Sequence, residues 1–380
     1  MKTASLEADI RRIGKEIFRR AEAAAPTPLS MAFWHQLVMR RLTQDDDLKM
    51  RAFRLIEVLP ALKDHRAIAR HIRDYFTALQ EKDAQNGTPD LPAPLRLALR
   101  FQRPDSAYAR LIAGAVHLGC GMGARRFIAG STPAEAIASV RTLRREGAAF
   151  TMDVLGETVI ADRVARHHQA LYISLIEHLS HEARGWREAS LLDRAPWGSL
   201  PRINISIKLT AIVPRFDPID PDGAIDSVLT RLRPILRVAR ELGAFINIDM
   251  EHYAVKDLTL EIYRRVLMEP EFRYWPDCGI VIQTYMPESE RDLASLIRWS
   301  RRRNAPITVR LVKGAYWDSE TASAIRNGWP IPLFTEKWQS DVAFERVARL
   351  MLENADIVRP AFASHNVRSI AACLAMEDAT

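Results

Sequence analysis

From residue 148 onward, short runs rich in β-branched residues alternate with long amphipathic segments of helical periodicity. Parallel strands need a crossover of a dozen or more residues, usually a helix, so this alternation is typical of a parallel α/β fold. The six strands that we expect are residues 149–155, 202–212, 244–252, 279–285, 306–313 and 360–365. The helices expected between them include residues 159–182, 223–241, 257–268, 289–303 and 338–353.

Within most of these strands apolar and polar residues alternate, and the ionisable residues lie towards the C-terminal end. The polar positions are Thr151, Asp153, Asn204, Ser206, Lys208, Asn247, Asp249, Glu251, Gln283, Thr308 and Arg310. A doubly wound sheet buries both faces and reads as continuous apolar runs, which these strands do not. A (β/α) barrel explains the pattern, because its polar groups point into the mouth. An antiparallel sheet with one solvated face is the alternative, and the long helix between every pair of strands argues against it.

The number of strands is smaller than a closed barrel of this class requires. Eight strands are needed, and two further βα units would take roughly 75 more residues. We therefore expect a (β/α)8-type, TIM-like barrel that is truncated after strand six.

The first 147 residues are predicted to be helical. In residues 5–24 the apolar positions Ile10, Ile13 and Ile17 recur at helical spacing, and similar patterns occupy residues 31–62, 64–81, 106–118 and 133–147. Ser131-Thr132-Pro133 has the form of a helix start, and residues 86–94 (NGTPDLPAP) read as a linker. The predicted organisation is a helical arm at 1–85, a helical linker or domain at 86–147 and the incomplete barrel at 148–380.

Composition excludes several other classes of protein. Lys and Arg total 54 and Asp and Glu total 47, and a net charge of +7 over 380 residues gives no indication of nucleic acid as a partner. Cys120, Cys278 and Cys373 lie far apart, which indicates a reducing compartment and neither a disulfide framework nor a zinc site. The charged N-terminus is not a signal peptide, and the longest nearly uncharged stretch, 111–124, is too short to span a membrane.

Two features can carry chemistry. The segment VRLVKGAYWDSE, residues 309–320, places a cation, a flexible glycine and two aromatic residues at the barrel mouth. It can bind a planar ligand, or Tyr316 and Trp317 can simply close the barrel end. Lys208, at an inward-facing strand end, can bind a carboxylate, form a Schiff base or act as a structural ion-pair partner of Asp153, Asp249 or Glu251.

Other motifs argue against alternative sites. His365-Asn366 ends the sixth strand without a second ligand at metal-binding spacing, and we propose no metal. GCGMGA at 119–124 follows a helical pattern and no strand, so it is not a dinucleotide-binding fingerprint.

Taken together, these motifs resemble the proline dehydrogenase domain of the bacterial proline utilization A family. VRLVKGAYWDSE, FTEKWQSD and FASHN resemble its flavin-binding core, and ISIKLTAI, NIDMEHY, IQTY and DVLGE occur in the order of the family. FRLIEVLPAL and the helical region before the barrel resemble its arm and helical domain.

The resemblance implies a role for individual residues. Lys208 would bind the substrate carboxylate, Tyr316 would contact the substrate, and Asp153 and Asp249 would support them. FAD would be contacted by Gln283, Arg310, Val312, Lys313, Gly314, Ala315, Trp317, Thr335, Lys337, Ser340, His365 and Asn366. Two departures, Glu336 for a basic residue and Ser340 for threonine, bear on cofactor affinity only.

The function that the resemblance implies is FAD-dependent oxidation of L-proline to 1-pyrroline-5-carboxylate, with electrons passed to a quinone. It also implies a cytoplasmic protein, either free or peripheral at the inner face of the membrane. Its partners would be a downstream pyrroline-5-carboxylate (glutamate-semialdehyde) dehydrogenase and a second copy of the chain. The rival functions are a Schiff-base aldolase that uses Lys208 and a non-catalytic fragment or interaction module.

A larger departure concerns residues beyond strand six. A tyrosine and a pair of arginines that hold the substrate carboxylate in the family have no match in these 380 residues. We therefore expect the 380-residue chain by itself to have little proline dehydrogenase activity.

Overall fold

The computed structural model describes residues 3–27, 46–62, 64–86, 128–155 and 159–378, with isolated residues between 30 and 40 and at 114 and 116. The chain forms two compact units, one of residues 1–20 with 132–380 and the other of residues 21–131. Among the helices described, none is both long and apolar enough to cross a membrane.

The smaller unit contains the helices α3 (Asp46–Val58) and α4 (His65–Asn86), with the 3-10 turn η1 (Leu59–Ala61) after α3. Its core is apolar and consists of Leu48, Leu55, Leu59, Ile68, Ile72 and Phe76. Helices predicted within 31–62 and at 64–81 are confirmed where the structure describes them. The predicted linker, the helix at 106–118 and the GCGMGA segment lie outside the described residues, apart from two single positions.

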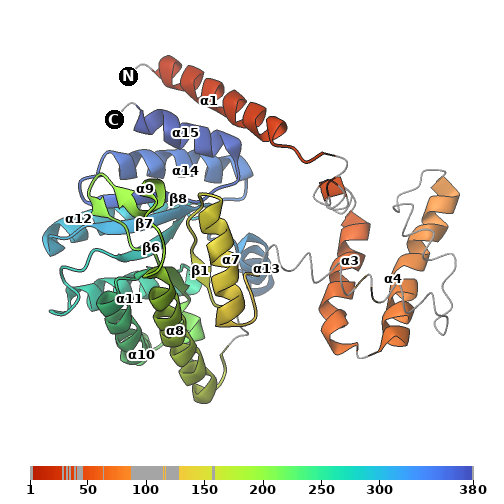
Figure 1. Cartoon of the computed structure of the whole chain (residues 1–380), viewed down its shortest axis with the longest axis horizontal. Helices are drawn as coiled ribbons and strands as arrows, with labels where there is room; N and C mark the ends of the chain where they lie inside the picture. Colours follow the sequence, from red (N-terminus) through yellow and green to blue (C-terminus); the bar gives the residue numbers. More distant parts are fainter. Residues whose placement is uncertain are drawn as a thin grey trace. The chain divides into compact units, whose positions relative to one another are not determined.

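The larger unit is built on one parallel sheet, drawn in Figure 1 from the yellow β1 to the blue β8. Its strands are β1 (Met152–Asp153), β4 (Asn204–Ile207), β5 (Phe245–Ile248), β6 (Cys278–Gln283), β7 (Ile307–Val312) and β8 (Val358–Phe362). They lie side by side in that order, each parallel to the next. A doubly wound sheet reverses its strand order at a switch point, whereas a (β/α) barrel adds strands in sequence. The predicted parallel barrel class with six strands is therefore confirmed.

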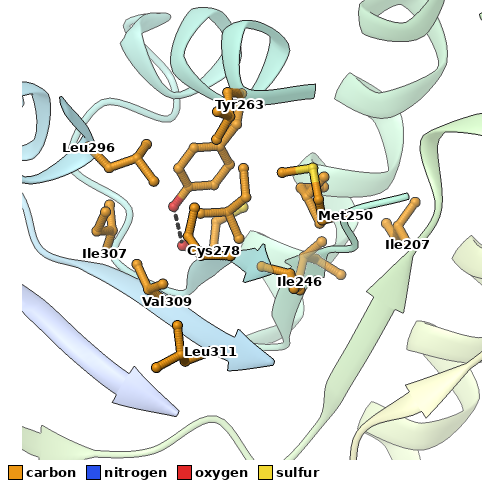
Figure 2. Packing of buried hydrophobic residues seen from close by; sticks show 14 of the residues in the cluster. Ile207, Ile246, Met250, Tyr263, Cys278, Leu296, Ile307, Val309 and Leu311 are labelled. Atoms are coloured by element: carbon orange, nitrogen blue, oxygen red, sulfur yellow. Dashed lines mark hydrogen bonds between the residues drawn. The ribbon is translucent and has the colours of Figure 1, made fainter. Parts of the chain in front are cut away.

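A helix follows each strand and covers the apolar side of the sheet. These helices are α8 (Asp162–Ala183), α10 (Pro221–Leu242), α11 (Lys256–Met268), α12 (Ser289–Arg303), α14 (Lys337–Leu352) and α15 (Val367–Glu377), with α7 (Pro133–Arg145) preceding β1. The Thr132 side chain caps α7 by accepting a hydrogen bond from the Glu135 amide, as the Ser-Thr-Pro signal predicts. Figure 2 shows the core, in which Ile246, Val309 and Leu311 of the strands meet Leu296 of α12.

Several predicted boundaries are wrong. The first strand has two residues in place of the expected seven. The second strand ends at Ile207, and the 3-10 turn η2 (Leu209–Ala211) follows it. The last strand begins at Val358 and contains Pro360, which is tolerated because β8 has only one strand neighbour in the described sheet. Three elements were not expected: α13 (Trp317–Asn327), the short helix α9 (Ser190–Asp193) and the hairpin β2 (Arg194–Ala195) with β3 (Gly198–Ser199).

The N-terminal helix α1 (Thr3–Ala23) packs beside α15, near the other end of the chain (Figure 1). Leu6 and Ile10 are buried in the same core as the sheet. Arg368 of α15 donates to both carboxylate oxygens of Glu7 at 3.0 Å, and also to Glu345 of α14. The hydrogen bonds and charge of Arg368, with those of Arg11, lower the pKa of Glu7 to about 2. This helix is therefore fixed to the barrel by apolar burial and by an ion-pair network.

Candidate active site

A cavity of about 410 Å³ lies at the carboxyl ends of the strands. In barrels of this class the functional site lies at that end. Ten of the predicted site residues line it: Lys208, Asp249, Gln283, Arg310, Val312, Lys313, Gly314, Ala315, Tyr316 and His365. The other lining residues were not predicted, because they are apolar or small and carry no distinctive pattern. They are Met250, Val281, Ala363 and Ser364.

Two cations and two carboxylates form one network in the cavity wall. Lys208 Nζ donates to Asp153 Oδ2 and lies 3.4 Å from Asp249 Oδ2. Arg310 donates from Nη2 to Asp249 Oδ1 and from Nη1 to Ser206 Oγ at 3.1 Å. Asp153 is outside the set of lining residues and reaches the cavity only through Lys208. The formal charges of the four groups cancel.

The register of the sheet brings these residues together. Asp153 of β1 is the partner of Ser206 in β4, and Ser206 is the partner of Asn247 in β5. Since side chains on one face recur every second residue, Lys208 and Asp249 lie one step further along that same face. Asn247 Nδ2 also donates to Asp249 Oδ1 at 3.0 Å, which orients the carboxylate. The alternation seen in the sequence thus predicts the cluster correctly.

Lys208 remains protonated in this environment. Burial by itself would lower its pKa, but the hydrogen bond from Lys208 to Asp153 and the charges of Asp153 and Asp249 outweigh it, so the pKa is raised. For Asp153, burial raises the pKa, and the hydrogen bond and charge of Lys208 offset only part of that effect. The cavity therefore presents an ammonium group and no neutral amine.

Tyr316 also lines the cavity and is held by residues that follow β5. Its ring centroid is 4.4 Å from that of His252, and Glu320 of α13 accepts a hydrogen bond of 2.5 Å from the Tyr253 amide. Burial, followed by the charge of Glu251, raises the pKa of Tyr316. His252 and Glu320 were not predicted, because the contact joins segments 67 residues apart.

Gly314 allows the backbone to approach the cavity closely. Its φ of +135° is disfavoured for other residues, and a Cβ atom there would lie 2.5 Å from the ring of Tyr285. Tyr285 in turn donates its backbone N–H to the Lys313 carbonyl at 2.7 Å. A side chain at position 314 would therefore displace the turn that carries Lys313 and Tyr316.

The remaining predicted cofactor residues lie around the start of α14. Lys313 and Lys337 both donate to Asp341, a carboxylate that the sequence reading missed although it stands four residues after Lys337. Thr335 and Lys337 are exposed, and the carbonyl of buried Ser340 accepts a 3.4 Å hydrogen bond from Thr284. Trp317 is 40% exposed and donates to the Phe334 carbonyl at 2.9 Å. Asn366 is engaged as the cap of α15.

The hydrogen-bond donors and cations of this cavity fit the polar groups of a dinucleotide flavin. Gln283 is 3% exposed, and its Nε2 donates to the Glu251 carbonyl at 2.8 Å, which fixes the orientation of its amide in the cavity wall. Arg310 and Lys313 add cationic donors in the cavity, and exposed Lys337 extends the positive charge beyond it. The turn at Gly314 leaves a space that a Cβ would fill. These are donors for a polar ring edge and for an anionic chain.

A second cavity, of about 370 Å³, lies at the amino ends of the strands. Two of its arginines bind carboxylates, Arg144 to Asp193 and Arg359 to Asp277, and Arg310 lines both cavities. It holds none of Lys208, Lys313 and Tyr316. We therefore place the candidate site at the carboxyl ends.

Comparison with known proteins identifies the family of the chain. Residues 136–380 match the family model described as proline dehydrogenase, and residues 7–127 match the proline utilization A N-terminal domain. The bifunctional protein PutA of Escherichia coli is 31% identical over 65% of the chain but only 18% of its own length. Proline dehydrogenase 1 of Bacillus subtilis is 30% identical over 62% of the chain and 63% of its own length.

Solved structures give the same result. The crystal structure of proline utilization A from Bdellovibrio bacteriovorus, inactivated by N-propargylglycine, superposes with a TM-score of 0.84 at 35% identity. That superposition covers 98% of this chain and 36% of the other. The chain thus spans 18% of the Escherichia coli protein and 36% of the Bdellovibrio bacteriovorus protein. Since one family model accounts for residues 136–380, the chain belongs to the proline dehydrogenase family.

Proposed function

We propose that the cavity at the carboxyl ends of the strands oxidises L-proline to 1-pyrroline-5-carboxylate with FAD as the cofactor. The observation that carries this proposal is the protonated Lys208, held between Asp153 and Asp249 and lining the same cavity as the Gly314 turn and Tyr316. Family membership supports the choice of proline as substrate.

Lys208 would bind the substrate carboxylate by a charge-assisted hydrogen bond. Because Asp153 and Asp249 fix the direction of its Nζ, the carboxylate would be held in one orientation, which orients the ring carbon next to nitrogen. Tyr316, which lines the same cavity, would contact the apolar part of the proline ring.

FAD would be held by Gln283, Arg310 and the 312–315 turn at its ring system, and by Lys313, Lys337 and the start of α14 at its pyrophosphate. When bound, it would supply the two-electron acceptor for the carbon–hydrogen bond that is broken. The other residues predicted to contact FAD lie around α14 and α15 and would do so through backbone or side-chain groups. They are Thr335, Ser340, His365 and Asn366.

The onward steps are also proposals. Electrons would leave for a quinone, and the product would pass to a pyrroline-5-carboxylate dehydrogenase, either as a separate partner or as a linked domain. The name "bifunctional" carried by the Escherichia coli relative is consistent with a linked domain.

The aldolase alternative is disfavoured by the state of Lys208. Schiff-base formation needs a neutral amine, and the raised pKa of Lys208 keeps it charged. Trapping with borohydride in the presence of carbonyl compounds is expected to give no adduct.

The decisive experiment is the visible spectrum of the purified protein. A bound flavin spectrum that bleaches on anaerobic addition of L-proline would support the proposal, with D-proline as the control. Purified protein that takes up no added FAD would contradict it and favour the interaction module. Repeating the measurement on a longer version that includes the sequence following residue 380 in the relatives tests whether the 380-residue chain has low turnover by itself.

A further inference from the structure

Tyr172 of α8 lies completely buried behind the candidate site. Its side chain is 0% exposed, and the proton of its hydroxyl has no acceptor among the residues that the structure describes. A buried, unpaired hydroxyl costs free energy, so such groups are normally paired.

Asp153 carries the matching unpaired atom. Its Oδ2 accepts the hydrogen bond from Lys208 Nζ, whereas Oδ1 is buried and has no partner in the described part of the chain. One group has a proton to donate, and the other has a free acceptor.

The two groups share a neighbourhood. Burial, followed by the charge of Asp153, raises the pKa of Tyr172, and the backbone N–H of Lys208 lies against the same hydroxyl and acts in the opposite direction. Asp153 and Lys208 come from adjacent strands, β1 and β4, and α8 is the helix that follows β1. The hydroxyl therefore lies beside the junction of the two strands that carry the ion pair.

We propose that Tyr172 is a positioning residue for the Asp153–Lys208 pair. Its hydroxyl accepts a hydrogen bond from the Lys208 amide and donates one to Asp153 Oδ1, which leaves Oδ2 to bind Lys208 Nζ. One side chain on α8 then fixes both the backbone of Lys208 and the carboxylate that directs its ammonium group.

The structural part of this inference is independent of the proposed function and can be tested without proline or flavin. The variant is Tyr172→Phe, which removes the hydroxyl and keeps the ring. The readout is the pKa of Asp153, which is measured by an NMR pH titration of protein labelled with ¹³C at the aspartate carboxyl carbon. The signal of Asp153 is assigned as the one that is missing in Asp153→Asn.

The charged groups that act on Asp153 are Lys208, Asp249 and Arg310, and all of them are retained in Tyr172→Phe. Loss of a donor to the carboxylate destabilises its charged form, so the pKa of Asp153 should rise by about one unit. The matched control is Tyr263→Phe, because Tyr263 is also buried, its hydroxyl donates to the Cys278 carbonyl at 2.9 Å (Figure 2), and it is not among the groups that act on Asp153.

An upward shift in Tyr172→Phe but not in Tyr263→Phe supports the proposal. No shift, or equal shifts in both variants, overturns it. If Tyr172→Phe does not fold, the ¹³Cζ signal of Tyr172 is compared between the unmodified chain and Asp153→Asn, and an unchanged chemical shift overturns the proposal equally.

A second readout rests on the proposed function. In flavin-loaded protein, Tyr172→Phe should raise the dissociation constant for L-proline about 5- to 10-fold, since Lys208 is less well directed. Flavin retention should be unchanged. Absence of proline binding in the unmodified chain would contradict the proposed function, whereas the Asp153 titration would still decide the role of Tyr172.

Discussion

Asp153 and Lys208, which stand 55 residues apart in the sequence, form an ion pair where β1 and β4 end. Neither residue has a partner on its own strand. The pair exists because two parallel strands are in register, and it fixes the ammonium group of Lys208 in the lining of the same cavity as Tyr316. The predictions below follow from this pair and from the elements that hold it.

Replacement of Lys208 by Ala should weaken proline binding about 10- to 150-fold, the effect of losing one hydrogen bond to a charged group. The dissociation constant for L-proline reports this change. Lys208→Arg is the matched variant, because it keeps the charge and should recover part of the affinity. Equal affinity of Lys208→Ala and the unmodified protein would exclude Lys208 from the substrate site.

Replacement of Arg310 by Met should weaken flavin retention or change the flavin reduction potential, because a cationic donor in the cavity wall is removed and Asp249 loses one of its partners. Retention is measured by gel filtration, and the potential by dye titration. Arg359→Met is the control, since Arg359 pairs with Asp277 at the opposite end of the sheet. Indistinguishable behaviour of the two variants would refute the assignment of Arg310.

Replacement of Gly314 by Ala should destabilise the site turn, because the new Cβ would collide with the ring of Tyr285 at 2.5 Å. Gly198→Ala provides the comparison: its φ of +129° is close to that of Gly314, but no atom lies within 4 Å of the added Cβ. Backbone strain of about 1–3 kcal/mol is common to both, so an excess loss of unfolding free energy in Gly314→Ala measures the collision. Equal losses in urea unfolding would show that the turn can move.

Lys256 and Asp292 form a buried ion pair of 2.7 Å between α11 and α12. Lys256→Met should lower the free energy of unfolding by about 3–5 kcal/mol, because it leaves the Asp292 charge buried without its cation. The double variant Lys256→Met with Asp292→Leu should be clearly more stable than the single variant. A double variant as unstable as the single one would mean that packing, and not charge, determines the loss.

Acid should release α1 from the barrel. The pKa of Glu7 is lowered from 4.5 to about 2 in the folded chain, so its contribution is complete above about pH 4.5 and is lost as the pH falls towards 2. Glu7→Gln should increase the rate of proteolysis within α1 about 2- to 5-fold at neutral pH and remove this pH dependence. Glu16→Gln is the control, since Glu16 pairs only with Arg19 and Arg20 of the same helix in the described structure, although its pKa is also about 2. A similar rate in both variants would show that Glu7 does not hold the helix.

Local sequence patterns were sufficient to predict the class of the fold and the chemical character of the site. Periodicity of two in the strands and of 3.6 in the helices is a local property, so the parallel order of six strands and the polar face with Lys208, Asp249 and Arg310 could be predicted before any contact was known. The boundary of α12 at Ser289–Arg303 was correct for the same reason.

Only the tertiary structure decided which groups pair and which residues support them. The partner of each cation depends on sheet register and on helices distant in sequence: Asp153 for Lys208, Asp341 for Lys313 and Glu7 for Arg368. Tyr172 and His252 could not be recognised as supporting residues from the sequence, because an aromatic residue in an amphipathic pattern looks the same whether it fills the core or faces a charged pair. Long-range pairing depends on packing geometry and electrostatics, which the order of residues along the chain does not display.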